Sequence, residues 1–82
     1  MSDVGHDLHT LFPAEEEILH WLKTESAHFR SLATKHHYLG KEIHRIEAGL
    51  EAAAQERLEA LKRDRLALLD QIAALIATKR AA

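Results

Sequence analysis

The chain has 82 residues, of which 13 are acidic, 11 are basic and seven are histidine, and its formal net charge is −2. This length allows one small domain, and such a domain often gains stability from partner subunits because a short chain buries a modest fraction of its surface. Cysteine is absent, which excludes disulfides, thiolate metal sites and a cysteine nucleophile. The chain starts without the basic and apolar run of a secretory signal, and its most apolar stretch, residues 66–77, is too short to cross a bilayer. We therefore expect a soluble cytoplasmic protein that does not bind membranes.

Charge is distributed unevenly along the chain. Residues 1–25 hold six acidic and one basic residue (−5), whereas residues 26–82 hold seven acidic and ten basic residues (+3). This asymmetry predicts an acidic N-terminal segment against a mildly basic helical body. The densest basic cluster is Lys62, Arg63 and Arg65, and it is diluted by Glu59 and Asp64. Nucleic-acid binding is therefore only a third alternative.

The sequence of the N-terminal region predicts a mobile arm followed by a short helix. Residues 1–11 show no sustained period, so we expect them to be mobile. A helix is predicted over residues 13–24, because Pro13 suits a first helical turn and the glutamates that follow it favour the helix dipole. Ile18, Trp21 and Leu22 form the apolar side of this helix. They are a candidate partner-binding patch, although such residues more often close the open end of a helical hairpin.

A stripe of mostly apolar residues, spaced alternately three and four apart, runs along two further predicted helices over residues 27–48 and 55–78. This spacing is typical of coiled coils. We call the stripe, with Leu69 and Ile76 beside it, the seam; the spaced members, which oppose one another if the chain reverses near residue 52, are Phe29, Leu32, His36, Leu39, Ile43, Ile46, Leu58, Leu61, Arg65, Leu68, Ile72 and Leu75. Ser26 is suited to cap the first of the two helices. The second helix is apolar over a wider stripe than one partner helix needs, so we expect the N-terminal helix or another chain to cover it.

The connection between the two long helices leaves two geometries open. Gly49 favours a reversal near residues 49–54, whereas residues 50–55 have good helix propensity and could continue one long helix into an intermolecular coiled coil. If the turn centres near residue 52, each spaced member of the seam meets another spaced member. The flanking pairs are then Glu42–Lys62 and Glu47–Arg57, of opposite charge. We favour the antiparallel hairpin.

Several short motifs together resemble the small bacterial YdcH-like family. They are Leu11-Phe12-Pro13, the step Phe29-Arg30-Ser31-Leu32, the pair His36-His37 and the run from Leu61-Lys62-Arg63 to Ile72. The resemblance implies a short helical hairpin with coiled-coil character. It implies no established catalysis and a role in association.

Histidines are the candidates for site chemistry. His37 and His44 lie seven residues apart on one side of a predicted helix, and His6 and His9 are one turn apart, but no helical spacing gathers the three or four ligands of a tight zinc site. His36 lies on the seam, where it could set the register or act as a pH switch that weakens association below about pH 6. No phosphate loop or nucleophilic triad is present, so we expect no enzyme, no cofactor and no metal.

The predicted fold is an all-α, antiparallel coiled-coil-like helical hairpin with a short N-terminal helix. We expect it to form a homodimer or a higher oligomer. The predicted function is a small protein-interaction module that binds itself and is also open to another protein. The alternative is a histidine-mediated metal- or haem-binding protein.

Overall fold

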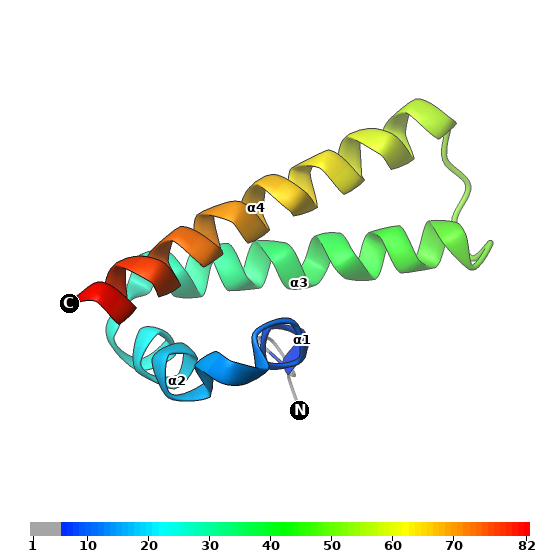
Figure 1. The fold of residues 1–82 in the computed structure, drawn as a ribbon. Helices are drawn as coiled ribbons and strands as arrows, with labels where there is room; N and C mark the ends of the chain where they lie inside the picture. The colour runs from blue at the N-terminus through cyan, green and yellow to red at the C-terminus, as the bar shows by residue number, and fades with distance from the viewer. Residues whose placement is uncertain (1–5) are drawn as a thin grey trace.

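The structure, a computed structural model, describes residues 6–82, and every element in that range is helical. The elements are α1 (His6–Leu11), the 3-10 helix η1 (Pro13–Glu15), α2 (Glu16–Glu25), α3 (Ala27–Glu47) and α4 (Gln55–Ala81). Helices α3 and α4 lie antiparallel and side by side, and the described chain measures 43 × 26 × 22 Å (Figure 1). The antiparallel hairpin is confirmed. The single long helix is not formed, because the chain reverses between α3 and α4.

Both ends of α3 are fixed by local hydrogen bonds. At its start, the Ser26 hydroxyl accepts a hydrogen bond from the Phe29 N–H at 3.0 Å, which confirms Ser26 as the N-cap. At its end, Gly49 has a φ of +79°, its N–H donates to the Ile46 carbonyl, and the Leu50 N–H donates to the Arg45 carbonyl. This is a Schellman motif, in which a left-handed residue turns the chain off the helix axis. Gly49 thus ends α3 although no polar cap precedes α4.

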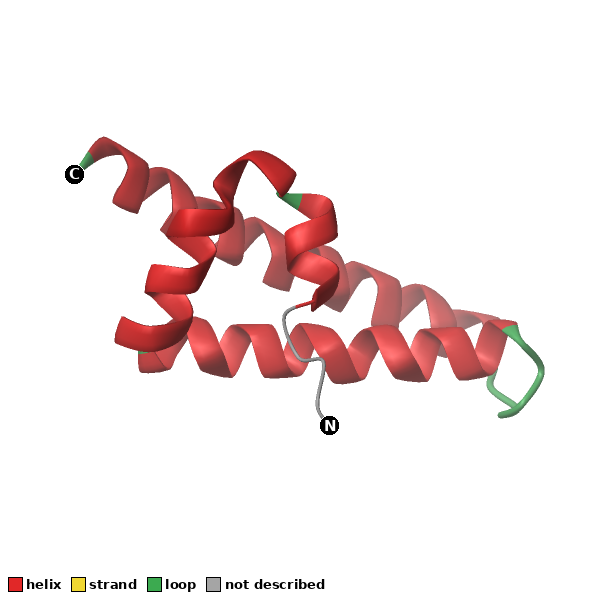
Figure 2. Cartoon of the chain, turned by 90° about the horizontal axis from the view of Figure 1, so that it is seen from below, coloured by secondary structure: helices red, strands yellow, loops and turns green. Residues whose placement is uncertain are grey.

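The N-terminal helical segment, residues 6–25, packs over the half of the hairpin away from the turn (Figures 1 and 2). The expected mobile arm lies outside the described residues over 1–5. Over residues 6–11 the chain forms the helix α1, and its Leu8 is 1% exposed. Burial of Leu8 supplies the tertiary contact that a helix of this length needs, since so short a helix is not stable alone.

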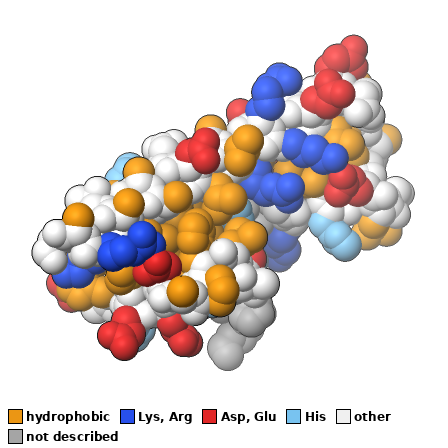
Figure 3. All heavy atoms as spheres, in the orientation of Figure 1, with side chains coloured by type: hydrophobic (Ala, Val, Ile, Leu, Met, Phe, Trp, Pro, Cys, Tyr) orange, Lys and Arg blue, Asp and Glu red, His pale blue; other side chains and the backbone are white. Residues whose placement is uncertain are grey.

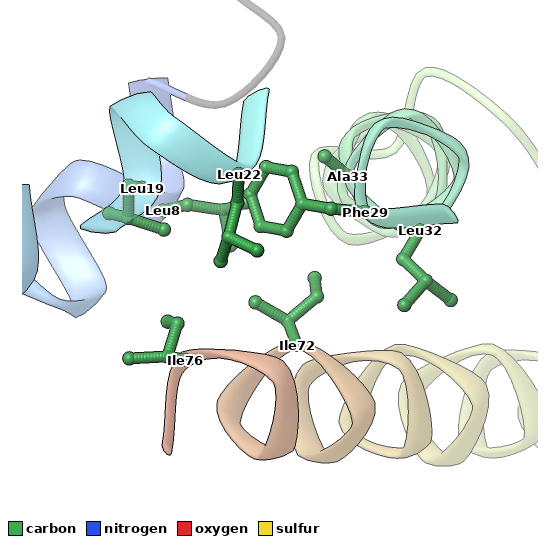
Figure 4. Packing of buried hydrophobic residues seen from close by; sticks show 8 residues of the cluster. All are labelled: Leu8, Leu19, Leu22, Phe29, Leu32, Ala33, Ile72 and Ile76. Carbon is green, nitrogen blue, oxygen red and sulfur yellow. The ribbon is translucent and has the colours of Figure 1, made fainter. Parts of the chain in front are cut away.

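The core lies where the N-terminal helical segment meets α3 and α4. Figure 4 shows the side chains of the three layers pointing toward one another. The buried cluster consists of Leu8, Leu19, Leu22, Phe29, Leu32, Ala33, Ile72 and Ile76. The wide apolar stripe of α4 is therefore covered in part by the chain's own N-terminal helices.

Candidate functional site

The seam predicted from the sequence lies along the contact between α3 and α4, but its members are buried to different degrees. The buried members are Phe29, Leu32, His36, Ile43, Ile72 and Ile76. The members of intermediate exposure are Leu39, Ile46, Leu58, Leu61, Arg65, Leu68, Leu69 and Leu75. Four of the six buried members belong to the cluster that the N-terminal helical segment covers, whereas Ile43, 1% exposed, is buried outside that cluster.

The turn half of the hairpin, residues 39–65, consists of the end of α3, the turn and the start of α4, and Asp7 of α1 lies at its edge beside Gly40 and Lys41. Two seam leucines of α4 in this half, Leu58 and Leu61, keep intermediate exposure, and Leu50 next to the turn is exposed. Acidic and basic residues are equally frequent here, six of each, and Figure 3 shows both signs interspersed around hydrophobic side chains at this end. A two-helix layer can bury only one stripe of each helix, so apolar area remains accessible here.

Ion pairs join α3 and α4 in the turn half. Arg57 pairs with Glu42, and the Lys62 ammonium lies 2.8 Å from a Glu47 carboxylate oxygen. The sequence-based pairs, Glu42–Lys62 and Glu47–Arg57, are therefore wrong, although the same four residues meet. Their long side chains reach diagonally along the hairpin instead of directly across it. The Lys62 hydrogen bond and charge lower the pKa of the Glu47 carboxyl.

His36 is the buried polar residue of the seam, and the residue facing it was missed by sequence reasoning. Its Nδ1 lies 3.0 Å from Oδ2 of Asp7 in α1. The two atoms are at ion-pair distance without hydrogen-bond alignment, and Nδ1 of His36 and Oδ1 of Asp7 are buried without a hydrogen bond. The four-residue spacing of Leu8 and Phe12 was the available signal for an apolar helix face beside Asp7, but it did not place that face against His36.

Arg65, the second polar member of the seam, is half buried in α4. Its charge adds to the lowering of the Glu47 pKa, so it contributes to the same charged cluster as Lys62. Lys62 and Arg63 are exposed, but Lys62 is already paired with Glu47. The basic cluster that could contact phosphates is thus partly neutralised within the chain.

The candidate partner patch of α2 is divided by the fold. Leu22 is buried in the core and Ile18 packs against it. Trp21 is 43% exposed, and the Lys79 ammonium lies 4.0 Å from the centre of its ring. Arg80 pairs with Glu15 beside it. These contacts attach the C-terminal end of α4 to the N-terminal helical segment, so most of the patch is internal.

The histidine candidates His37 and His44 share one shallow groove of α3. His37 packs edge-to-face on Tyr38 at 5.3 Å between ring centres, and His44 is exposed. The groove also holds the cations Lys41 and Arg45 and the carboxylate of Asp7 from α1. Within residues 6–82, no group of three or more His, Cys, Asp or Glu side chains is placed to hold a metal ion.

A second groove runs between α3 and α4, and it concentrates exposed apolar surface. Its α3 wall is Thr34, Lys35, Tyr38, Leu39 and Glu42, and its α4 wall is Asp64, Ala67, Leu68 and Gln71. Tyr38 is 60% exposed in the middle of this groove. We call it the α3–α4 groove.

These features define a small all-α protein built on an antiparallel helical hairpin with an N-terminal helical cover. The chain belongs to the family described as "Protein of unknown function (DUF465)", whose model matches residues 29–76. The matched range comprises nearly all of α3, the turn and most of α4. No curated protein and no solved structure matches the chain. None of the described helices is long and apolar enough to pass through a membrane.

Proposed function

We propose that this chain is a small helical interaction module that associates with copies of itself and catalyses no reaction. The carrying observation is the apolar surface that the N-terminal helical segment leaves open on the hairpin. Tyr38 and Leu66 are 60% and 59% exposed, and neighbouring members of the seam are only half buried. Exposed apolar surface rimmed by charges is typical of a helix-packing interface.

The charges of the turn half support self-association. Six acidic and six basic residues lie within residues 39–65, so two copies of this half meet without net repulsion. Other proteins with a matching helical face are possible partners of the same surface. The YdcH-like family proposed from the sequence is compatible with the family match, and a cytoplasmic location is the compartment that we propose.

Mass measurement tests this proposal. Sedimentation and light scattering, from low to high micromolar chain, are expected to show a concentration-dependent dimer or higher oligomer. The same purified material is expected to carry no stoichiometric zinc or haem, and any nucleic-acid binding should be weak and abolished by moderate salt. A chain that stays monomeric at high micromolar concentration contradicts self-association, and stoichiometric metal or haem would favour the histidine-based alternative.

A further inference from the structure

The α3–α4 groove has walls of a symmetric pattern. On α3, Lys35 and Glu42 lie seven residues apart and flank the apolar pair Tyr38 and Leu39. Two helical turns separate positions seven apart, so all four residues lie near one stripe of the helix. Along this stripe, the cation Lys35 is followed by the apolar pair and then by the anion Glu42.

The α4 wall repeats this arrangement with different polar groups. Asp64 and Gln71 lie seven residues apart and flank Ala67 and Leu68. Here the polar ends are a carboxylate, which accepts hydrogen bonds, and an amide, which can donate them. Each wall thus has an apolar centre and two ends that are complementary to each other.

A twofold axis through the groove makes each wall complementary to itself. Such an axis, crossing α3 between residues 38 and 39, places Lys35 of one copy opposite Glu42 of the other, and the reverse. The same axis crosses α4 between residues 67 and 68. It places Asp64 of one copy opposite Gln71 of the other, and the reverse. The crossed ion pairs Arg57–Glu42 and Lys62–Glu47 lie on either side of a register in which the reversal centres near residue 52. In that register, the point where the axis crosses α3 and the point where it crosses α4 are offset by about 3 Å along the hairpin. A small crossing angle between the helices of the two copies accommodates this offset.

We propose that the α3–α4 groove is the contact surface of a twofold-symmetric dimer in which α3 packs antiparallel on α3 of a second copy. This inference rests on the proposed self-association and assigns its surface. Exchange of contacts between identical patches is what a closed dimer requires. Tyr38 lies at the centre, where large aromatic residues contribute most of the binding energy of an interface.

The contacts within one chain leave room for the proposed ion pair between Lys35 of one copy and Glu42 of the other. Glu42 is already paired with Arg57 of its own chain, so Lys35 of the second copy would complete a cluster of two cations around one carboxylate. Lys35 is exposed and has no ion-pair partner among residues 6–82, so its ammonium is free for such a contact. The N-terminal helical segment contributes no residue to the lining of the groove, so it leaves this surface open.

Charge reversal provides the test. In Lys35→Glu, or in Glu42→Lys, each homodimer would hold two like-charge pairs, and its dissociation constant is expected to rise on the order of tenfold. An equimolar mixture of the two variants restores opposite charges at both pairs, so the mixture is expected to dimerise more tightly than either variant alone. Lys23→Glu, an equal change of charge on α2, is expected to leave dimerisation unchanged. Circular dichroism checks that each variant retains its helices.

The outcomes separate the two proposals. If the wild-type chain dimerises but the mixture dimerises no better than its components, the contact surface lies elsewhere and only the present inference is wrong. If the wild-type chain is monomeric, self-association itself is wrong. Preferential formation of the mixed dimer, resolved by native mass spectrometry, supports both.

Discussion

Nδ1 of His36 lies 3.0 Å from Oδ2 of Asp7, and this contact joins the seam of α3 to the N-terminal helix α1. His36 is 4% exposed, whereas the Asp7 side chain is 43% exposed, so the carboxylate reaches the buried ring from the edge of the core. The sequence-based expectation that association weakens below about pH 6 stays a prediction, which sedimentation at about pH 7.5 and about pH 5.5 tests.

Asp7→Asn is expected to loosen α1. The substitution keeps the size of the side chain but removes the carboxylate charge beside His36, and we expect a loss of about 0.5 kcal/mol from the docking of α1 because the Asp7 side chain is 43% exposed. Hydrogen exchange of the α1 backbone amides should quicken more than exchange in α3 and α4. Asp70→Asn, on the exposed side of α4, is the control. Equal exchange in the two variants would show that the Asp7–His36 contact does not hold α1.

Among the buried side chains, truncation of Ile72 should lower the free energy of unfolding most. Its exposed fraction is 0%, and it projects from α4 toward Leu22 of α2 and Phe29 of α3 in the core cluster (Figure 4). Ile72→Ala should lower the free energy of unfolding by about 2–5 kcal/mol, because it removes buried methyl groups and leaves a cavity. Leu66→Ala, on the same helix at a 59% exposed position, should change it by less than about 0.5 kcal/mol. Urea unfolding followed by circular dichroism measures both, and similar losses would place the core elsewhere.

The two glycines of α3 and its C-terminal turn should respond to alanine in opposite directions. Gly49 has a φ of +79°, which strains any residue with a Cβ, so Gly49→Ala should destabilise the hairpin by about 1 kcal/mol. Gly40 lies within α3, and a Cβ added there meets none of the described residues within 4 Å. Gly40→Ala should therefore stabilise α3 by about 1 kcal/mol through helix propensity. Thermal unfolding compares them, and a destabilising Gly40→Ala would reveal a neighbour packed on Gly40.

Glu47 should contribute to the acid sensitivity of the hairpin. Lys62 holds the pKa of its carboxyl below the ordinary value of 4.5, so the folded state binds this proton less readily than the unfolded state does. The resulting stability is complete above that ordinary value and is lost as the pH falls through the folded-state pKa. Between about pH 5 and about pH 3, Glu47→Gln should therefore lose less stability than the wild-type chain. Glu25→Gln, at the exposed end of α2, controls for the removal of a carboxylate, and parallel acid profiles for Glu47→Gln and wild type would contradict the prediction.

Sequence periodicity determined the two long helices and favoured a reversal between them. The three- and four-residue spacing from Phe29 to Ile46 and from Leu58 to Ile76 depends only on helix geometry, and the capping role of Ser26 depends on its immediate neighbours. Gly49 ended α3 for an equally local reason, because left-handed backbone favours glycine. Such short-range effects can be inferred from residue order alone.

Tertiary structure alone decided which parts of the seam are covered and which groups meet around it. The six residues of α1 are too few to fold without Leu8 in the core, so neither the helix nor the Asp7–His36 contact follows from local propensity. The crossed pairing of Glu42 with Arg57 depends on side-chain reach between helices, and the α3–α4 groove requires two helices at one spacing and angle. These features arise from packing between segments distant in the sequence, and a linear pattern does not specify the geometry of that packing.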